Sequence, residues 1–153
     1  MRAGALRAHL AALTLLVAAC DGGAPRPAEL DTRHESCRFC RMTVSERPFA
    51  AQVVAPGEEP VFFDDLGCLR DFLGSGGKLP TGATIFVADH RTGEWVSGAT
   101  ALYTEVPTLQ TPMASHLVAH ADVASRDADP TAAGGLPVAA AAIFGPSGAP
   151  GTP

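Results

Sequence analysis

Residues 49–88, FAAQVVAPGEEPVFFDDLGCLRDFLGSGGKLPTGATIFVA, decide the fold class of this chain. Apolar and β-branched residues over 49–55 predict a strand, and Val61-Phe62-Phe63 predicts a second one. The residues between them, Pro56-Gly57-Glu58-Glu59, are typical of a turn. The stretch therefore begins with a β-hairpin.

A short amphipathic helix follows the hairpin. Leu66, Leu69 and Leu73 recur with the spacing of one helix face. We expect this helix to run over about 65–73 and to end at Gly74, because glycine is the commonest residue just after a helix.

Two aspartates open this helix. We interpret Asp64 as the N-cap and Asp65 as a first-turn residue, because negative charge is favourable at a helix N-terminus. These roles explain both carboxylates without catalysis. The next predicted strand, over 83–88, completes a ββαβ unit.

Weaker strand signals follow this unit. Residues 94–96, 101–106 and 117–121 predict further strands, and we expect 135–144 to supply one edge strand. A second ββαβ copy over about 94–145 fits this order, although the sequence shows no helix for it. The predicted fold class is a small α+β sandwich with a mostly antiparallel sheet, and tandem ββαβ units are one form of it.

The composition limits the class of protein. The chain has 153 residues, which is enough for one ordinary domain. A net charge of −5 disfavours nucleic-acid binding, which requires a basic surface. Four cysteines are too few for a disulfide-dense scaffold but enough for a redox pair or a metal site.

The first residues are typical of an exported lipoprotein. Residues 1–19 combine a positive start with an apolar run, as in a signal peptide. Val17-Ala18-Ala19-Cys20 resembles the lipobox, in which the cysteine is lipidated; an ordinary signal peptide that leaves Cys20 as a free thiol is the alternative. We expect a tether over 20–33 and a disordered tail over 145–153. The lipid would anchor the domain to the periplasmic face of a bacterial membrane.

Two thiols and one thioether lie within the six residues Cys37-Arg38-Phe39-Cys40-Arg41-Met42. The CxxC spacing is not a haem attachment, because Arg41 stands where histidine is required. A zinc ribbon is disfavoured as well, because the chain has no second CxxC pair. A redox dithiol and a soft metal site remain.

Met42 favours the metal site. In an extended segment, Cys40 and Met42 at positions i and i+2 would point to the same side. A thiolate and a thioether together select Cu(I) over harder ions. The alternative is that Met42 is the first core residue of a strand.

Three blocks of the chain share their order and spacing with a known family. They are Cys37-x-x-Cys40-x-Met42, Phe63-Asp64-Asp65-Leu66-Gly67-Cys68 and Thr111-Pro112-Met113. Together they resemble the NosL family, lipoproteins regarded as copper chaperones for nitrous oxide reductase. The resemblance covers roughly residues 34–121, and the domain extends at most to about residue 144.

The resemblance has implications for structure and function. It implies a tandem ββαβ domain and one Cu(I) bound by Cys40 and Met42, with Met113 as the third ligand. The implied function is that of a membrane-anchored metallochaperone. The implied partner is nitrous oxide reductase or the membrane complex that matures it.

Other donor residues are less specific. Cys37 is either a further copper ligand or a thiol that forms a disulfide with Cys40. Cys68 is interpreted as a buried thiol, with a disulfide to Cys37 or a ligand role as alternatives. His34 is close enough in sequence to complete the coordination of the metal.

The remaining residues show no catalytic arrangement. His116 and His120 are weaker ligand candidates, and His90, in a predicted turn, is expected to be solvated. We see no nucleophile–base pair and no phosphate-binding loop, and we therefore expect no enzyme activity. Two other functions stay open: a thiol–disulfide oxidoreductase that uses Cys37 and Cys40, and a lipoprotein that binds a protein partner without metal.

Overall fold

The computed structural model describes residues 25–146. The predicted signal peptide, Cys20, the start of the predicted tether and residues 147–153 of the predicted tail lie outside the described residues. Within 25–146, no helix has both the length and the apolar character required to cross a bilayer.

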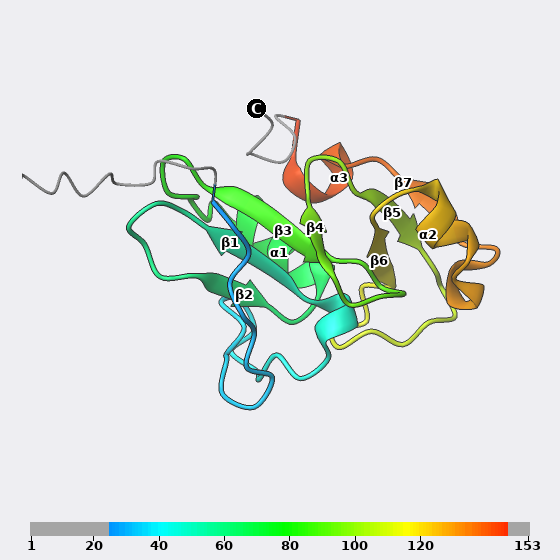
Figure 1. Cartoon of the computed structure of the whole chain (residues 1–153), viewed down its shortest axis with the longest axis horizontal. Helices are drawn as coiled ribbons and strands as arrows, with labels where there is room; N and C mark the ends of the chain where they lie inside the picture. Colours follow the sequence, from blue (N-terminus) through cyan, green and yellow to red (C-terminus); the bar gives the residue numbers. More distant parts are fainter. Residues whose placement is uncertain (1–24, 147–153) are drawn as a thin grey trace, which may run out of the picture.

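A four-stranded antiparallel sheet forms the first half of the domain (Figure 1). Its strand order is β2-β1-β3-β4, with β1 paired to both β2 and β3. A 3₁₀ turn, Arg47–Phe49, precedes the sheet. The elements are β1 (Ala51–Val54), β2 (Val61–Phe63), α1 (Leu66–Gly74), β3 (Thr84–Ala88) and β4 (Trp95–Ser97).

A three-stranded antiparallel sheet forms the second half, with the order β6-β5-β7. Together the two sheets and the short helices confirm the predicted α+β class. The elements are β5 (Leu102–Glu105), β6 (Leu117–His120), α2 (Val123–Asp127), a 3₁₀ turn (Pro130–Ala132), β7 (Leu136–Val138) and α3 (Ala141–Phe144).

The two halves have the same topology. In β1–β2–α1–β3 and in β5–β6–α2–β7, the first strand is central and pairs antiparallel with the strands before and after the helix. Each helix is capped by an aspartate two residues after the preceding strand, Asp65 in α1 and Asp122 in α2. The tandem ββαβ arrangement is therefore confirmed, and α2 is the helix that the sequence did not show. The bounds of the second unit differ from the predicted 94–145, because β4 pairs with β3 in the first sheet and the second unit runs over 102–138.

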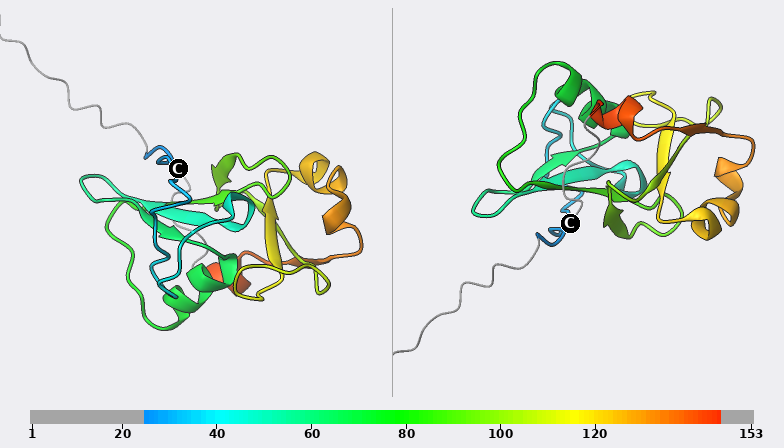
Figure 2. Two further views of the ribbon diagram at one scale, coloured as in Figure 1. Left: turned by 90° about the horizontal axis from the view of Figure 1, so that it is seen from below. Right: turned by 90° about the horizontal axis from the view of Figure 1, so that it is seen from above.

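The main core lies between the first sheet and the helices on one of its faces. Figure 2 shows α1 and α3 together on that face, where Phe63, Leu66 and Leu69 are fully buried. Burial of such side chains is the main stabilising contribution of a small domain, at about 1.5–3 kcal/mol for each large apolar side chain.

Gln52 connects β1 to the residues that precede the cysteine loop. Its side chain is fully buried, accepts the backbone N–H of Ala28 at 2.7 Å and donates to the Ala28 carbonyl at 3.1 Å. Both polar ends of a buried amide are thereby satisfied. Ala28 and Leu30 also pack against the core, so the segment that we expected to be a tether contacts the domain from Ala28 onward.

The start of α1 differs from the prediction. Asp65, not Asp64, is the N-cap, and its carboxylate accepts the Gly67 backbone N–H at 2.6 Å. Only one of two adjacent aspartates can occupy the cap position, so the Asp64 carboxylate remains for another contact.

Candidate metal centre

The loop that contains Cys37 and Cys40 is a tight turn. The Cys37 N–H donates to the Met42 carbonyl at 2.7 Å, and the Arg41 N–H donates to the Cys37 carbonyl at 3.1 Å. Arg41 has a φ of +68°, in the left-handed region that reverses the chain direction. The Arg38 N–H donates to the Phe62 carbonyl at 2.8 Å, which attaches the loop to β2.

Four donor side chains from three segments converge beside this loop. Cys37 and Cys40 belong to the loop, Asp64 follows β2, and Cys68 lies in the first turn of α1. Their three sulfurs and one carboxylate oxygen all lie within 4.8 Å of one another. We call this set the Cys3Asp cluster. It has the residue types and the spacing of a metal site.

The cluster has one partly exposed member. Cys37, Asp64 and Cys68 are each at most 2% exposed, whereas Cys40 is half-buried. The Cys40 thiol lies 3.4 Å from each oxygen of the Asp64 carboxylate, to which it donates. Access from the solvent is therefore through Cys40.

The three thiols differ in acidity. A hydrogen bond from the Cys68 thiol stabilises the Cys37 thiolate and lowers the pKa of Cys37 to about 6. Burial raises the pKa of Cys40 to about 11. The pKa of Cys68 is also raised, because its thiol donates the hydrogen bond to Cys37. Cys37 is thus the most acidic of the three thiols, and metal binding would displace the protons that the cluster carries.

No arginine in the described part of the chain is among the groups that shift the pKa of Cys37. Arg38 and Arg41 are exposed, which is the usual place for isolated arginine side chains. The low pKa of Cys37 has another origin, the thiol of Cys68.

Both thioethers of the predicted site are exposed. Met42 is 57% and Met113 is 42% exposed. The premise that Cys40 and Met42 lie on an extended segment is wrong, because Arg41 between them is left-handed. Ligation by the two methionines stays a prediction.

Asp65 holds the Met113 loop against the start of α1. Its Oδ2 accepts the Thr111 hydroxyl at 2.6 Å and the Met113 backbone N–H at 2.9 Å. The neighbouring Asp64 contacts Cys40. Two consecutive carboxylates therefore attach the cysteine loop and the Met113 loop to the same helix start.

Gly67 permits this close approach. A Cβ atom at Gly67 would lie 2.6 Å from the Ser115 Cβ and 3.0 Å from Asp65 Oδ1. Any larger residue would push the Met113 loop away from α1, because Cβ atoms do not approach so closely.

His34 is not part of the cluster. Its Nδ1 is hydrogen-bonded to Asp31 Oδ2 at 2.8 Å, and its side chain is 75% exposed. Asp64 is the member that sequence reasoning missed, because we interpreted it as the helix cap. The signal was the aspartate doublet, in which only one residue can cap. Cys68 is buried as expected, but within reach of the other donors.

The chain was compared with known proteins at three levels. No family model, no curated protein and no solved structure matches it. The Cys3Asp cluster is therefore interpreted from its own geometry.

Proposed function

We propose that this protein is a lipid-anchored, extracytoplasmic Cu(I) chaperone that delivers copper for the assembly of nitrous oxide reductase. The observation that supports it most directly is the Cys3Asp cluster, in which three sulfurs meet within 4.8 Å. Thiolate and thioether ligands favour Cu(I) over harder ions. The chaperone role, the partner and the anchor rest on the NosL resemblance and on the lipobox-like sequence before Cys20.

The exposure of the donors supports release as well as binding. Cys37 and Cys68 are buried, and would retain an ion within the domain. Cys40 is half-buried, and the exposed Met42 follows it by two residues. A ligand from an acceptor protein can reach the ion on this side, so transfer by ligand exchange would not require the domain to open.

The oxidoreductase alternative is less consistent with the thiols. A reactive dithiol needs an accessible thiolate of low pKa. Here the thiol of low pKa, Cys37, is fully buried, and the more accessible one, Cys40, has a raised pKa. This is the reverse of the arrangement that rapid thiol–disulfide exchange requires.

An anaerobic Cu(I) titration of the reduced full-length protein against a chromogenic chelator tests the proposal. We expect about one equivalent to bind and excess Zn(II) not to displace it. Cys40→Ser should lower the Cu(I) affinity by at least about tenfold, because it removes a thiolate ligand. Met42→Leu and Met113→Leu should each lower it several-fold without a large change in volume.

Phe39→Leu is the matched control. Phe39 is 41% exposed on the same loop and has no donor atom, so this variant should bind Cu(I) as the parent does. Absence of Cu(I) binding, or unchanged affinity in Cys40→Ser, contradicts the proposal. Disulfide reductase activity that is lost in Cys37→Ser would support the oxidoreductase instead.

A further inference from the structure

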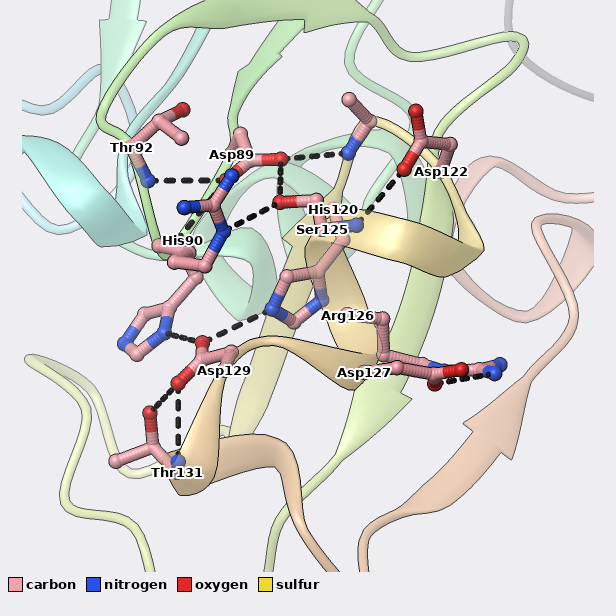
Figure 3. Close-up of polar contacts among 12 residues, drawn as sticks. Asp89, His90, Thr92, His120, Asp122, Ser125, Arg126, Asp127, Asp129 and Thr131 are labelled. Atoms are coloured by element: carbon pink, nitrogen blue, oxygen red, sulfur yellow. Dashed lines mark hydrogen bonds and ion pairs between the residues drawn. The ribbon is translucent and has the colours of Figure 1, made fainter.

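A second group of metal-ligand residues lies in the other half of the domain. His90 Nδ1, His120 Nε2 and one carboxylate oxygen of Asp129 lie within 4.8 Å of one another. Figure 3 shows both imidazole rings directed at the Asp129 carboxylate. Asp129 Oδ2 is 2.7 Å from His90 Nδ1 and 3.0 Å from His120 Nε2.

We infer that His90, His120 and Asp129 form a second metal site, specific for a borderline divalent transition ion such as Zn(II). Two imidazole nitrogens and a carboxylate are ligands that such ions prefer, whereas Cu(I) prefers sulfur. The site is separate from the Cys3Asp cluster in both residues and ligand chemistry.

The three ligands are mostly shielded from water. The side chain of His120 is 0% exposed, that of Asp129 is 5% and that of His90 is 11%. His90 lies in a turn as expected, but the expectation that it is solvated is wrong. Its partly exposed ring leaves one side of the site open, where a water molecule can be the fourth ligand.

Each ligand is positioned by a different segment. His90 follows β3, and its backbone N–H donates to the Ala119 carbonyl at 2.8 Å. His120 is the last residue of β6. Asp129 lies between α2 and the following 3₁₀ turn, and its Oδ1 accepts the Thr131 backbone N–H at 2.9 Å. This second contact orients the carboxylate so that Oδ2 faces the rings.

The neighbouring Asp89 fixes the junction between these segments. Its Oδ2 accepts the Ser125 hydroxyl at 2.6 Å and its Oδ1 accepts the Thr92 N–H at 3.0 Å (Figure 3). Oδ2 also accepts the Ala121 N–H at 2.8 Å. The turn after β3 is thereby held against α2 whether or not an ion is bound. An ion at the adjacent site would cross-link the two ββαβ units.

The three ligand atoms lie slightly too close together for a bound ion, and a small movement would make room for it. Ligand atoms of a tetrahedral zinc site are roughly 3.3 Å apart, given metal–ligand bonds of about 2.0–2.1 Å. The contacts of 2.7 and 3.0 Å would have to lengthen by roughly half an ångström. The 3₁₀ segment after Asp129 is largely exposed at Pro130 and Thr131, so it can accommodate that shift.

The tautomer of His120 gives the proposal a specific signature. Its Nδ1 is buried and has no hydrogen-bond partner among the described residues, so we assign the proton of the metal-free ring to Nε2, which donates to Asp129. Binding through Nε2 moves that proton to Nδ1. In most metal-binding histidines the second ring nitrogen donates a hydrogen bond. The absence of such a partner for His120 Nδ1 should make zinc binding about 10–100-fold weaker than at a site where this hydrogen bond is present.

Zinc uptake by the full-length protein, measured by equilibrium dialysis, tests the inference. His90→Asn should bind one equivalent less than the parent, because it removes a ligand from a partly exposed turn. His116→Asn is the control, since His116 is bonded to the Leu109 carbonyl and belongs to neither cluster. Equal zinc uptake by the parent and His90→Asn overturns the inference.

Imidazole ¹H–¹⁵N spectra of the parent protein provide a test that does not depend on a variant. Zinc should convert His120 from the Nε2–H to the Nδ1–H tautomer and His90 from the Nδ1–H to the Nε2–H tautomer. Spectra in which both rings keep their metal-free tautomers at saturating zinc exclude the site.

Discussion

Asp65→Ala should cost far more stability than the equivalent change in the second half of the domain. Asp65 is fully buried, and its carboxylate accepts three hydrogen bonds from described residues, namely Gly67, Thr111 and Met113. Loss of the cap costs about 1 kcal/mol. Each of the other two hydrogen bonds to the carboxylate contributes about 1.5 kcal/mol, the lower end of the range for bonds to a charged group. The lower end applies because burial removes the carboxylate from water, and that loss offsets part of the gain. The expected loss is about 4 kcal/mol.

Asp122→Ala is the matched control. Asp122 caps α2 at the same topological position, but it is exposed, and among the described residues its carboxylate accepts only the Ser125 backbone N–H, at 2.8 Å. The expected loss is therefore about 1 kcal/mol. Urea unfolding of the full-length variants, followed by far-ultraviolet circular dichroism and extrapolated to water, measures both free energies.

The comparison isolates the contribution of the Met113 loop. A difference of about 3 kcal/mol between the two variants is expected. Equal losses, within about 0.5 kcal/mol, would refute the reasoning, because the bonds from Thr111 and Met113 would then contribute nothing. Thr111→Val should couple to Asp65→Ala by more than about 0.5 kcal/mol in a double-mutant cycle, since both remove the same hydrogen bond.

Two further changes test the attachment of segments to the first ββαβ unit, one at α1 and one at β1. Gly67→Ala should lower Tm and weaken Cu(I) binding, because the new Cβ would lie 2.6 Å from the Ser115 Cβ. A second substitution in the same chain, Ser115→Gly, should restore part of the lost Tm. An unchanged Tm in the single variant would contradict the close contact. Gln52→Leu should speed hydrogen exchange of the Ala28 amide by at least about tenfold, because it removes both hydrogen bonds to that residue. Mass spectrometry or NMR measures the exchange. An unchanged rate would show that Gln52 does not hold the segment around Ala28 against the sheet.

The first ββαβ unit could be predicted because its signals are local. Leu66, Leu69 and Leu73 mark one face of α1, and Val61-Phe62-Phe63 coincides with β2. In contrast, α2 has five residues and an exposed Val123 at its start. A helix of that length has no apolar stripe that a sequence pattern could reveal. Tertiary contacts, not periodicity, determine it.

The candidate site was predictable only where its residues are neighbours in sequence. Cys37 and Cys40 share one turn, so their proximity follows from their spacing. Cys68 lies near these two thiols only because β2 and α1 fold back onto the cysteine loop. Asp64 is free to contact them because Asp65, not Asp64, is the N-cap of α1. No local pattern connects His90, His120 and Asp129, which come from three separate segments.

If Cys20 carries a lipid, the two hydrogen bonds between Gln52 and Ala28 would also limit how far the domain can move from a bilayer. Ala28, the first described backbone position that is hydrogen-bonded to the sheet, would then lie eight residue steps along the chain from the anchor. A fully extended chain of that length spans at most roughly 28 Å. The domain would therefore stay close to the membrane surface and search for an acceptor by lateral diffusion in two dimensions. Lengthening the segment before Ala28 should then slow copper transfer to a membrane-bound acceptor without changing the affinity for copper.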